Sequence, residues 1–288
     1  MDSKLDVPPQ DEQYESEASD AGNMPPPPYR RASESSTERS LYDEKDVLLE
    51  NRSGSYQQPT SSAMQEYNWY HPKIMSRGLI ITDGASSTAT KKTAIYYVEV
   101  SEFAVKKPDV ILHSASPISG DSMDFDHVAS ASESGPVLGV AHFPHFSRHY
   151  KVCLGDPSSA NPTTWVDITN PHKMYHGEFT MSYQGKSYVW KRTHDAALGV
   201  GGGDIRQEMT WNSFQLLDSA TGEMIALFLE NTFKSWKKKG KLRIFKDLEG
   251  SEEARQFKLL VFLSIAAILE KARRRANRQR NAHGGGGP

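Results

Sequence analysis

Residues 259–269, which read Leu-Leu-Val-Phe-Leu-Ser-Ile-Ala-Ala-Ile-Leu, form an apolar stretch close to the C-terminus in which Ser264 is the single polar residue. As a helix rising about 1.5 Å per residue, the stretch is about 16 Å long, roughly half of the ~30 Å hydrocarbon core of a bilayer. A helix that is apolar on every side has to be buried, and the interior of the protein fits this length. The stretch therefore predicts a fold built around one central helix, which constrains the architecture more than the activity.

Charged residues mark both ends of this helix. Ser251 is placed to be the N-cap, and Glu252 and Glu253 follow in the first turn, where acids complement the helix dipole. Lys271 and the arginines at 273–275 lie at the other end, where cations complement it. We expect a helix over residues 251–275.

The chain between the N-terminal quarter and this helix has the composition of short strands. Aromatic and β-branched runs alternate with turn residues, which predicts a mostly β (α+β) protein of roughly ten to twelve antiparallel strands. Both a sandwich and a barrel fit this pattern. The expected strands are 78–82, 94–103, 109–113, 136–143, 150–154, 174–183, 187–193, 209–217, 223–233 and 241–245, with turns at 185–186, 218–222 and 239–240.

The order of several short segments before the helix resembles a known group of proteins. These segments are Trp211-Asn212-Ser213-Phe214, Leu216-Leu217-Asp218, Gly222-Glu223, Ala226-Leu227-Phe228 and Lys241-Leu242-Arg243-Ile244. Over residues 68–276 the chain resembles the tubby C-terminal-like superfamily of tubby, phospholipid scramblase and LURP-one-related proteins, and in particular its uncharacterised fungal members. The resemblance implies a closed antiparallel barrel of about twelve strands around the hydrophobic C-terminal helix.

Charge divides the chain into parts. Residues 1–66 hold 14 acidic and 6 basic residues, whereas residues 67–288 hold 22 acidic and 28 basic ones. The first segment is rich in Ser, Pro and acids and has too few apolar residues to offset the entropy of ordering, so we expect a disordered acidic tail. We expect the barrel domain over 67–276 and a disordered basic, Gly-rich tail over 277–288. Cys153 is the only cysteine and no signal-peptide pattern opens the chain, so a cytoplasmic, non-secreted protein is expected.

Two short motifs lie close together in the acidic tail. Pro26, Pro27 and Tyr29 form a Pro-Pro-x-Tyr motif, which suits the aromatic groove of a WW domain such as those of ubiquitin ligases. A low-complexity proline run is the alternative. Ser33 follows two arginines and matches a basophilic kinase site, where a phosphate would add negative charge near Tyr29; an unused serine is the alternative.

A third motif in the tail matches an acidic dileucine sorting signal, with Glu44 four residues before Leu48 and followed by Leu49. A sorting signal requires a protein that sits on a membrane. A short transient helix explains the same residues, and we favour that interpretation.

Basic and aromatic residues are interleaved over 233–246. The cations are Lys234, Lys237, Lys238, Lys239, Lys241 and Arg243, with Lys246 at the end. Such a segment can lie against anionic phospholipid, with up to about 1 kcal/mol for each cation near the surface, and the resemblance to tubby proteins implies phosphoinositides. A solvated turn is the alternative. Nucleic acid is not an expected partner because no recognised motif accompanies the charge.

The sequence offers no convincing catalytic or metal site. His142, His145, His149 and Cys153 have ligand-type side chains, but residues 149 and 153 of one strand are about 13 Å apart, too far for one ion, so Cys153 is expected in the core. We expect no metal, no cofactor and no enzymatic activity. The expected function is an interaction module that is peripheral to a membrane, binds anionic phospholipid and recruits a WW-domain ubiquitin ligase. A membrane-inserted, scramblase-like protein is the alternative, although the cysteine-rich and calcium-binding segments typical of scramblases are missing.

Overall fold

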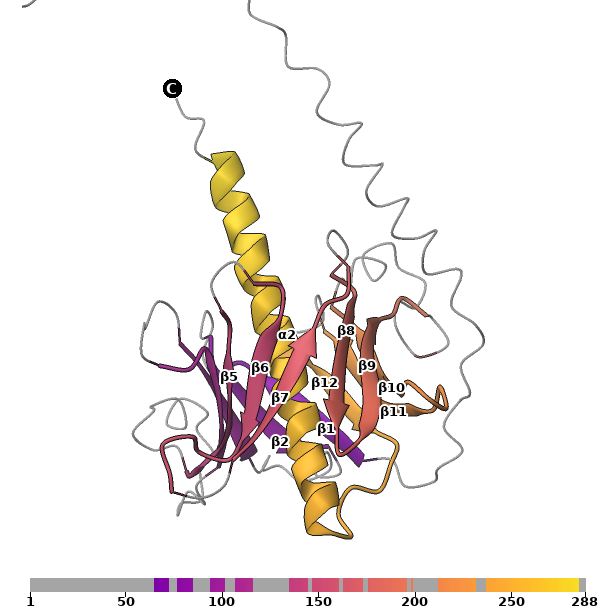
Figure 1. Cartoon of the computed structure of the whole chain (residues 1–288). Helices are drawn as coiled ribbons and strands as arrows, with labels where there is room; N and C mark the ends of the chain where they lie inside the picture. Colours follow the sequence, from indigo (N-terminus) through magenta and orange to yellow (C-terminus); the bar gives the residue numbers. More distant parts are fainter. Residues whose placement is uncertain are drawn as a thin grey trace, which may run out of the picture. The chain divides into compact units, whose positions relative to one another are not determined.

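Twelve strands and one long helix make up the described part of the chain in the computed structural model (Figure 1). The structure describes residues 65–72, 77–84, 94–101, 107–115, 135–144, 147–160, 163–172, 176–195, 198, 212–231 and 237–284. The strands are β1 (Gln65–Tyr70), β2 (Leu79–Asp83), β3 (Ala94–Val100), β4 (Val110–Ser114), β5 (Val137–His142), β6 (Tyr150–Leu154), β7 (Thr164–Thr169), β8 (Glu178–Tyr183), β9 (Lys186–Arg192), β10 (Phe214–Asp218), β11 (Met224–Glu230) and β12 (Lys238–Ile244), and they are followed by α2 (Glu252–Gly284).

The strands form one closed antiparallel barrel. Each strand pairs with its neighbours in sequence, and β1 pairs with β12 to close the sheet. The predicted fold class is confirmed, and of the two arrangements that the strand pattern allowed, the barrel is the one formed. Because neighbours alternate in direction, the even-numbered strands all begin, and the odd-numbered strands all end, at one end of the barrel.

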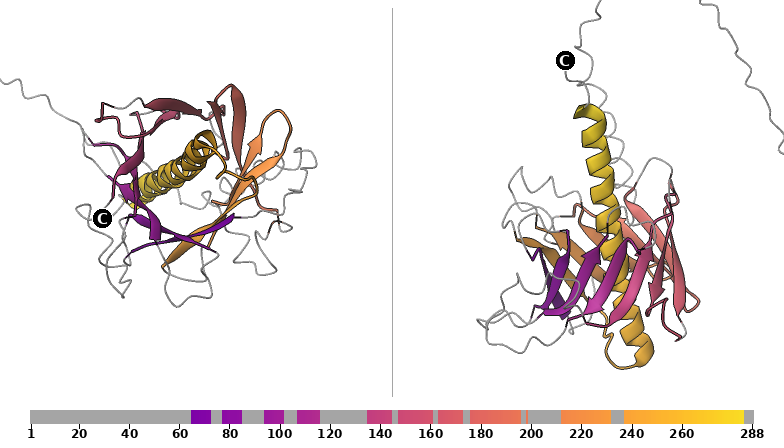
Figure 2. Two further views of the ribbon diagram at one scale, coloured as in Figure 1. Left: turned by 90° about the horizontal axis from the view of Figure 1, so that it is seen from below. Right: turned by 90° about the vertical axis from the view of Figure 1, so that its left-hand side faces the viewer.

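Helix α2 passes through the barrel, as Figure 2 shows in the view along the barrel. Phe257 and every residue of 260–269 are at most 6 % exposed, and they pack in one core with residues from strands all around the barrel. The apolar stretch is therefore the core of the fold. Beyond Glu270 the helix emerges at the end where the even-numbered strands begin, which we call the exit end (Figures 1 and 2).

The ends of the buried stretch are fixed by hydrogen bonds. Ser251 caps the helix as predicted, because its Oγ accepts a hydrogen bond from the Ala254 amide at 3.1 Å. The polar break inside the stretch also has a partner, since Trp190 Nε1 of β9 donates to Ser264 Oγ at 2.9 Å. Both side chains are fully buried. Ser264 is thus the acceptor for an inward-facing indole.

Two glycines allow close contacts inside the barrel. A Cβ on Gly139 of β5 would lie 3.0 Å from Leu263 of the helix and 2.7 Å from the Cys153 carbonyl oxygen. A Cβ on Gly240 would lie 2.6 Å from the Phe228 ring, so this glycine belongs to β12 and faces inward. The predicted turn at 239–240 is therefore wrong: Gly240 leaves room for an aromatic side chain of the neighbouring strand.

Other boundaries also differ from the expected ones. Strands β1 and β7 are not among the expected strands, and β1 begins at Gln65, where the acidic tail was expected. Helix α2 continues to Gly284 instead of ending at 275. The extra residues are mainly Ala, Arg, Asn and Gln without proline, so nothing in them ends a helix before the glycines at 284–287.

Candidate functional site

The structure leaves the predicted motifs of the acidic tail untested. Pro26, Pro27, Tyr29, Ser33, Glu44, Leu48 and Leu49 all lie outside the described residues, and so does Lys234 of the predicted basic patch.

The remaining cations of the patch lie along β12. Lys241 and Arg243 are half-buried, and Glu66 on the neighbouring strand β1 pairs with both, at 2.8 Å from Lys241 Nζ and 3.3 Å from Arg243 Nε. These hydrogen bonds and positive charges outweigh the effect of burial and lower the pKa of Glu66, so the carboxylate is ionised at neutral pH. Glu66 therefore neutralises one of the two positive charges on this part of the wall.

Strand β12 begins at the exit end of the barrel. Lys239 forms an ion pair with Glu230, which is itself almost fully buried, and the Lys238 ammonium lies 5.8 Å from the centre of the Tyr70 ring. Lys237 precedes the strand. The predicted patch is therefore divided. Lys241 and Arg243 lie on the barrel wall beside Glu66, whereas Lys237, Lys238 and Lys239 lie at the rim of the exit end.

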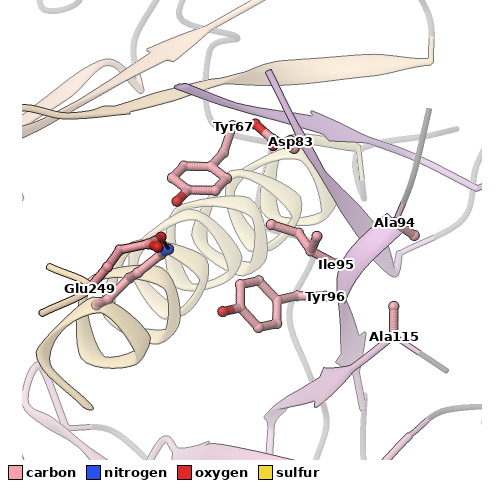
Figure 3. Close-up of a pocket in the computed structure, with 8 residues that line it drawn as sticks. Tyr67, Asp83, Ala94, Ile95, Tyr96, Ala115 and Glu249 are labelled. Atoms are coloured by element: carbon pink, nitrogen blue, oxygen red, sulfur yellow. Dashed lines mark hydrogen bonds and ion pairs between the residues drawn. The ribbon is translucent and has the colours of Figure 1, made fainter. Parts of the chain in front are cut away.

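A pocket of about 430 Å³ lies at the opposite end of the barrel, beside the first turns of α2 (Figure 3). Lys258 donates a hydrogen bond to Glu249 at 2.6 Å, and its ammonium lies 5.1 Å from the centre of the Tyr67 ring. Burial acts to lower the pKa of Lys258, but the hydrogen bonds to Glu249 and Tyr67 outweigh it and the pKa rises. Burial also raises the pKa values of Tyr67 and Tyr96. The pocket thus offers neutral hydroxyls and a compensated ion pair; it is lined by Tyr67, Asp83, Ala94, Ile95, Tyr96, Ala115, Glu249 and Lys258.

An ion-pair network holds the helix where it leaves the barrel. Glu270 is buried and accepts hydrogen bonds from Arg273 Nε at 2.7 Å and from Arg274 Nε at 2.6 Å. Arg274 also binds Asp109, just before β4, and donates to the Ser101 carbonyl at 2.6 Å. The carboxylates of Glu270 and Asp109 are thus engaged with two arginines of the helix.

A second group of cations lies at the same end, and we call it the exit-end cluster. The ammonium of Lys271 donates to the carbonyl oxygens of Ser147 and Arg148, at 2.9 Å each, and lies 5.0 Å from the centre of the Tyr150 ring. Burial, and then the charge of Arg278, lower the pKa of Lys271 to about 8. The cluster consists of Arg148 before β6, His176 before β8, Arg192 at the end of β9, and Lys271 and Arg275 on the helix.

The pKa of His176 reflects the positive charges of this cluster. Its pKa is lowered to about 4, first by burial and then by the positive charges of Arg275, Arg192, Lys271 and Arg148. The imidazole is therefore neutral at physiological pH. Its Nδ1 lies 3.4 Å from the side-chain amide nitrogen of the buried Asn170, which fits an acceptor role for Nδ1 and leaves the proton on Nε2.

Sequence reasoning did not find Arg148, His176 or Arg192. One signal was present, since Tyr188 and Trp190 face the core and Arg192 continues the same face of β9. An arginine at an inward position is unusual enough to attract attention. The approach of Arg148 and His176 depends on the barrel topology.

Of the histidine and cysteine residues considered for a metal, His149 directly follows Arg148 of this cluster, and its carbonyl oxygen lies 3.4 Å from Lys271 Nζ. Cys153 is fully buried with Ile111 and Val140, as expected for a core residue. His142 lies against Trp165, with 5.9 Å between the ring centres, and His145 is outside the described residues. Within the described ranges, no group of three or more His, Cys, Asp or Glu side chains is arranged to hold a metal ion. Among the described residues, no helix combines the length and the apolar character needed to cross a bilayer.

No protein-family model and no curated protein matches the chain. The chain is similar to an X-ray structure of a protein from Arabidopsis thaliana, with 10% sequence identity over 74% of this chain and 98% of that chain, at a TM-score of 0.37. A likeness at this level carries no argument, and the fold described above rests on the strand pairing itself.

Proposed function

We propose that the protein is a non-enzymatic interaction module that docks on anionic phospholipid surfaces with the exit end of its barrel. The observation that carries this proposal is the projecting end of α2 (Figure 2, right). Residues 270–284 hold six basic residues and one acid, and Arg278 and Arg280 are exposed. From Glu270 to Gly284 the helix extends about 21 Å at 1.5 Å per residue.

The rim around the helix adds to this positive charge. Lys237 and Lys238 of the predicted patch lie at this end, together with the exit-end cluster. Each cation held near an anionic membrane contributes about 1 kcal/mol, and the attraction falls off within a Debye length of about 8 Å at physiological salt. Several cations gathered at one end can therefore act together, whereas on the wall Glu66 offsets one of the two charges of Lys241 and Arg243.

Vesicle flotation at several salt concentrations tests the proposal. We expect the full chain to float with vesicles that contain phosphatidylserine, to remain unbound with neutral vesicles, and to dissociate as salt is raised. The variant Arg278→Gln/Arg280→Gln should bind about tenfold or more weakly, because it loses two cations at about 1 kcal/mol each. The matched variant Lys241→Gln/Arg243→Gln removes the same charge from the wall and should float like the native chain.

Two results would reject the proposal. Absence of flotation at low salt would reject binding to anionic lipid, and a larger loss in the wall variant than in the helix variant would reject the exit end as the docking surface.

We further propose that the acidic tail recruits a WW-domain ubiquitin ligase through Pro26, Pro27 and Tyr29. The sequence motif alone supports this part of the function. In a pulldown with isolated WW domains, Tyr29→Ala should abolish binding while Tyr14→Ala, a change to another tyrosine of the tail, should leave it unchanged. Equal binding by the two variants would exclude the motif.

Insertion of the hydrophobic helix into lipid is the competing function. The residues that would enter the bilayer, 259–269, are the ones that fill the barrel. Each buried Leu, Ile or Phe side chain contributes about 1.5–3 kcal/mol, so withdrawing the helix would open a large apolar cavity within the barrel. The packing therefore favours docking over insertion.

A further inference from the structure

Buried hydrogen-bond donors without partners lie at the exit end. In the described part of the chain, Arg148 Nη1, Arg192 Nε and the Tyr150 hydroxyl are buried and have no hydrogen-bond partner. Most buried polar groups in proteins are hydrogen-bonded, because an unsatisfied donor costs about 1–3 kcal/mol. Three such groups at one end of the barrel need an explanation.

Positive charges also predominate around His176 in the cluster. The charges that act most strongly on the pKa of His176 belong to Arg148 before β6, Arg192 at the end of β9, and Lys271 and Arg275 of α2, and these are cations. Three carboxylates at this end have other partners. Asp109, whose charge also acts on Lys271, accepts from the Phe143 amide at 2.7 Å and binds Arg274. Glu270 binds Arg273 and Arg274, and Glu178 lies 3.8 Å from His172. Cations gathered in a partly buried site repel one another, and an anion among them would remove this repulsion.

The geometry of the donors indicates which anion fits. Guanidinium groups match the oxygens of phosphate, and Arg192 is held inward, with its guanidinium carbon 5.8 Å from the centre of the Phe214 ring. Neutral His176, with its proton on Nε2, adds one more donor. A phosphate monoester, with up to two negative charges and three terminal oxygens, uses more of these donors than a carboxylate does.

We propose that the exit-end cluster binds the phosphate group of a phosphomonoester, with Arg148, Arg192 and His176 as donors and Lys271 and Arg275 as further positive charges. This inference rests on the proposed function where the phosphate belongs to a lipid headgroup, because docking by the exit end brings the headgroup to the cluster. A soluble phosphomonoester would offer the same chemical group.

Inorganic phosphate is the first probe, and NMR titration of the histidines in the full chain is the measurement. The signal of His176 is assigned by its loss in His176→Asn. Bound phosphate should raise the pKa of His176 by at least one unit, because a negative charge then offsets the four cations, whereas acetate at equal ionic strength should have a much smaller effect. An identical pKa with phosphate and with acetate would overturn the proposal, and this test on the native chain needs no arginine variant.

Flotation then identifies the source of the phosphate and separates this inference from the proposed function. Vesicles with phosphatidic acid, a monoester, are compared with phosphatidylserine vesicles of equal surface charge. The native chain should prefer phosphatidic acid about tenfold, Arg192→Gln should lose this preference while it still binds phosphatidylserine, and Arg280→Gln should weaken both equally. Equal binding of the native chain to both lipids, without a response of His176 to phosphate, leaves the proposed function standing and rejects this inference. A phosphate-dependent pKa without any flotation rejects the proposed function and supports a soluble ligand.

Discussion

Replacing Ser264 by alanine tests whether the one polar residue of the apolar stretch is there to serve the barrel wall. Trp190 Nε1 donates to Ser264 Oγ at 2.9 Å, and Ser264 Oγ in turn lies 3.1 Å from the Val261 carbonyl oxygen. Both side chains are fully buried, so water cannot replace the lost oxygen. The Val261 carbonyl keeps its hydrogen bond within the helix, but the indole N–H loses its acceptor.

The expected cost follows from this single unsatisfied donor. A buried donor that loses its partner costs about 1–3 kcal/mol, so we expect the free energy of unfolding to fall by about 2 kcal/mol. For a domain of this size, this change lowers the melting temperature by about 4–8 °C. On hydrophobicity alone, alanine should instead be neutral or stabilising in an apolar core.

A double-mutant cycle provides the control. Trp190→Phe removes the donor, so Ser264→Ala in that background should cost less than about 0.5 kcal/mol, and the coupling between the two positions should exceed about 1 kcal/mol. Urea unfolding followed by circular dichroism measures all four chains without relying on tryptophan fluorescence. The reasoning is refuted if Ser264→Ala leaves the stability unchanged, or costs the same in both backgrounds.

Three further variants test the packing and the charges at the exit end. Gly139→Ala should lower the free energy of unfolding by about 1–3 kcal/mol, because the new Cβ would meet Leu263 of the helix and a carbonyl oxygen. The control Gly250→Ala, whose Cβ would have no atom within 4 Å, should leave the free energy of unfolding nearly unchanged; urea unfolding measures both. Glu270→Gln should cost about 3 kcal/mol because it breaks a buried ion pair, while Glu252→Gln, in an exposed pair, should change the stability by less than about 0.5 kcal/mol in the same assay. The pKa of His176 is about 4 in the folded chain, whereas the ordinary pKa of a histidine is 6.5. Between pH 6.5 and pH 4 the unfolded chain therefore takes up a proton that the folded chain does not, so the free energy of unfolding falls as the pH drops. At pH 4 the native chain should have lost about 1–2 kcal/mol more than His176→Asn, after allowance for solvent screening, and an equal loss in both would contradict this assignment.

The central helix was predictable because its signal is local. An apolar stretch with an N-cap and charges of opposite sign at its ends can be recognised without knowing its neighbours. Strand β7 also carried a local signal, since the buried Val166 and Ile168 alternate with the exposed Trp165 and Asp167, but it was not among the predicted strands. Strand β1 was hidden at the edge of a polar segment, and only pairing with β2 and β12 makes it a strand.

The candidate site was less predictable because it depends on contacts between distant residues. Glu66 was assigned to the acidic tail, yet it pairs with Arg243, 177 residues later, and so offsets the basic patch that the sequence suggested. Arg148, His176 and Arg192 are far apart in the chain. They come to the same end of the barrel because β6 and β8 begin there and β9 ends there. The composition shows how many cations the chain has, but the pairing of the strands determines which of them lie beside a carboxylate.

Hydrogen exchange of the full chain, free and bound to anionic vesicles, tests the central claim that the helix stays in the barrel while the exit end docks. We predict that the strands packed on the helix, β4, β5 and β6, and residues 257–269 remain equally protected in both states, while residues 275–282 exchange more slowly on vesicles. Faster exchange in those strands on vesicles, with residues 257–269 still protected, would show that the helix has moved into lipid and would contradict the account.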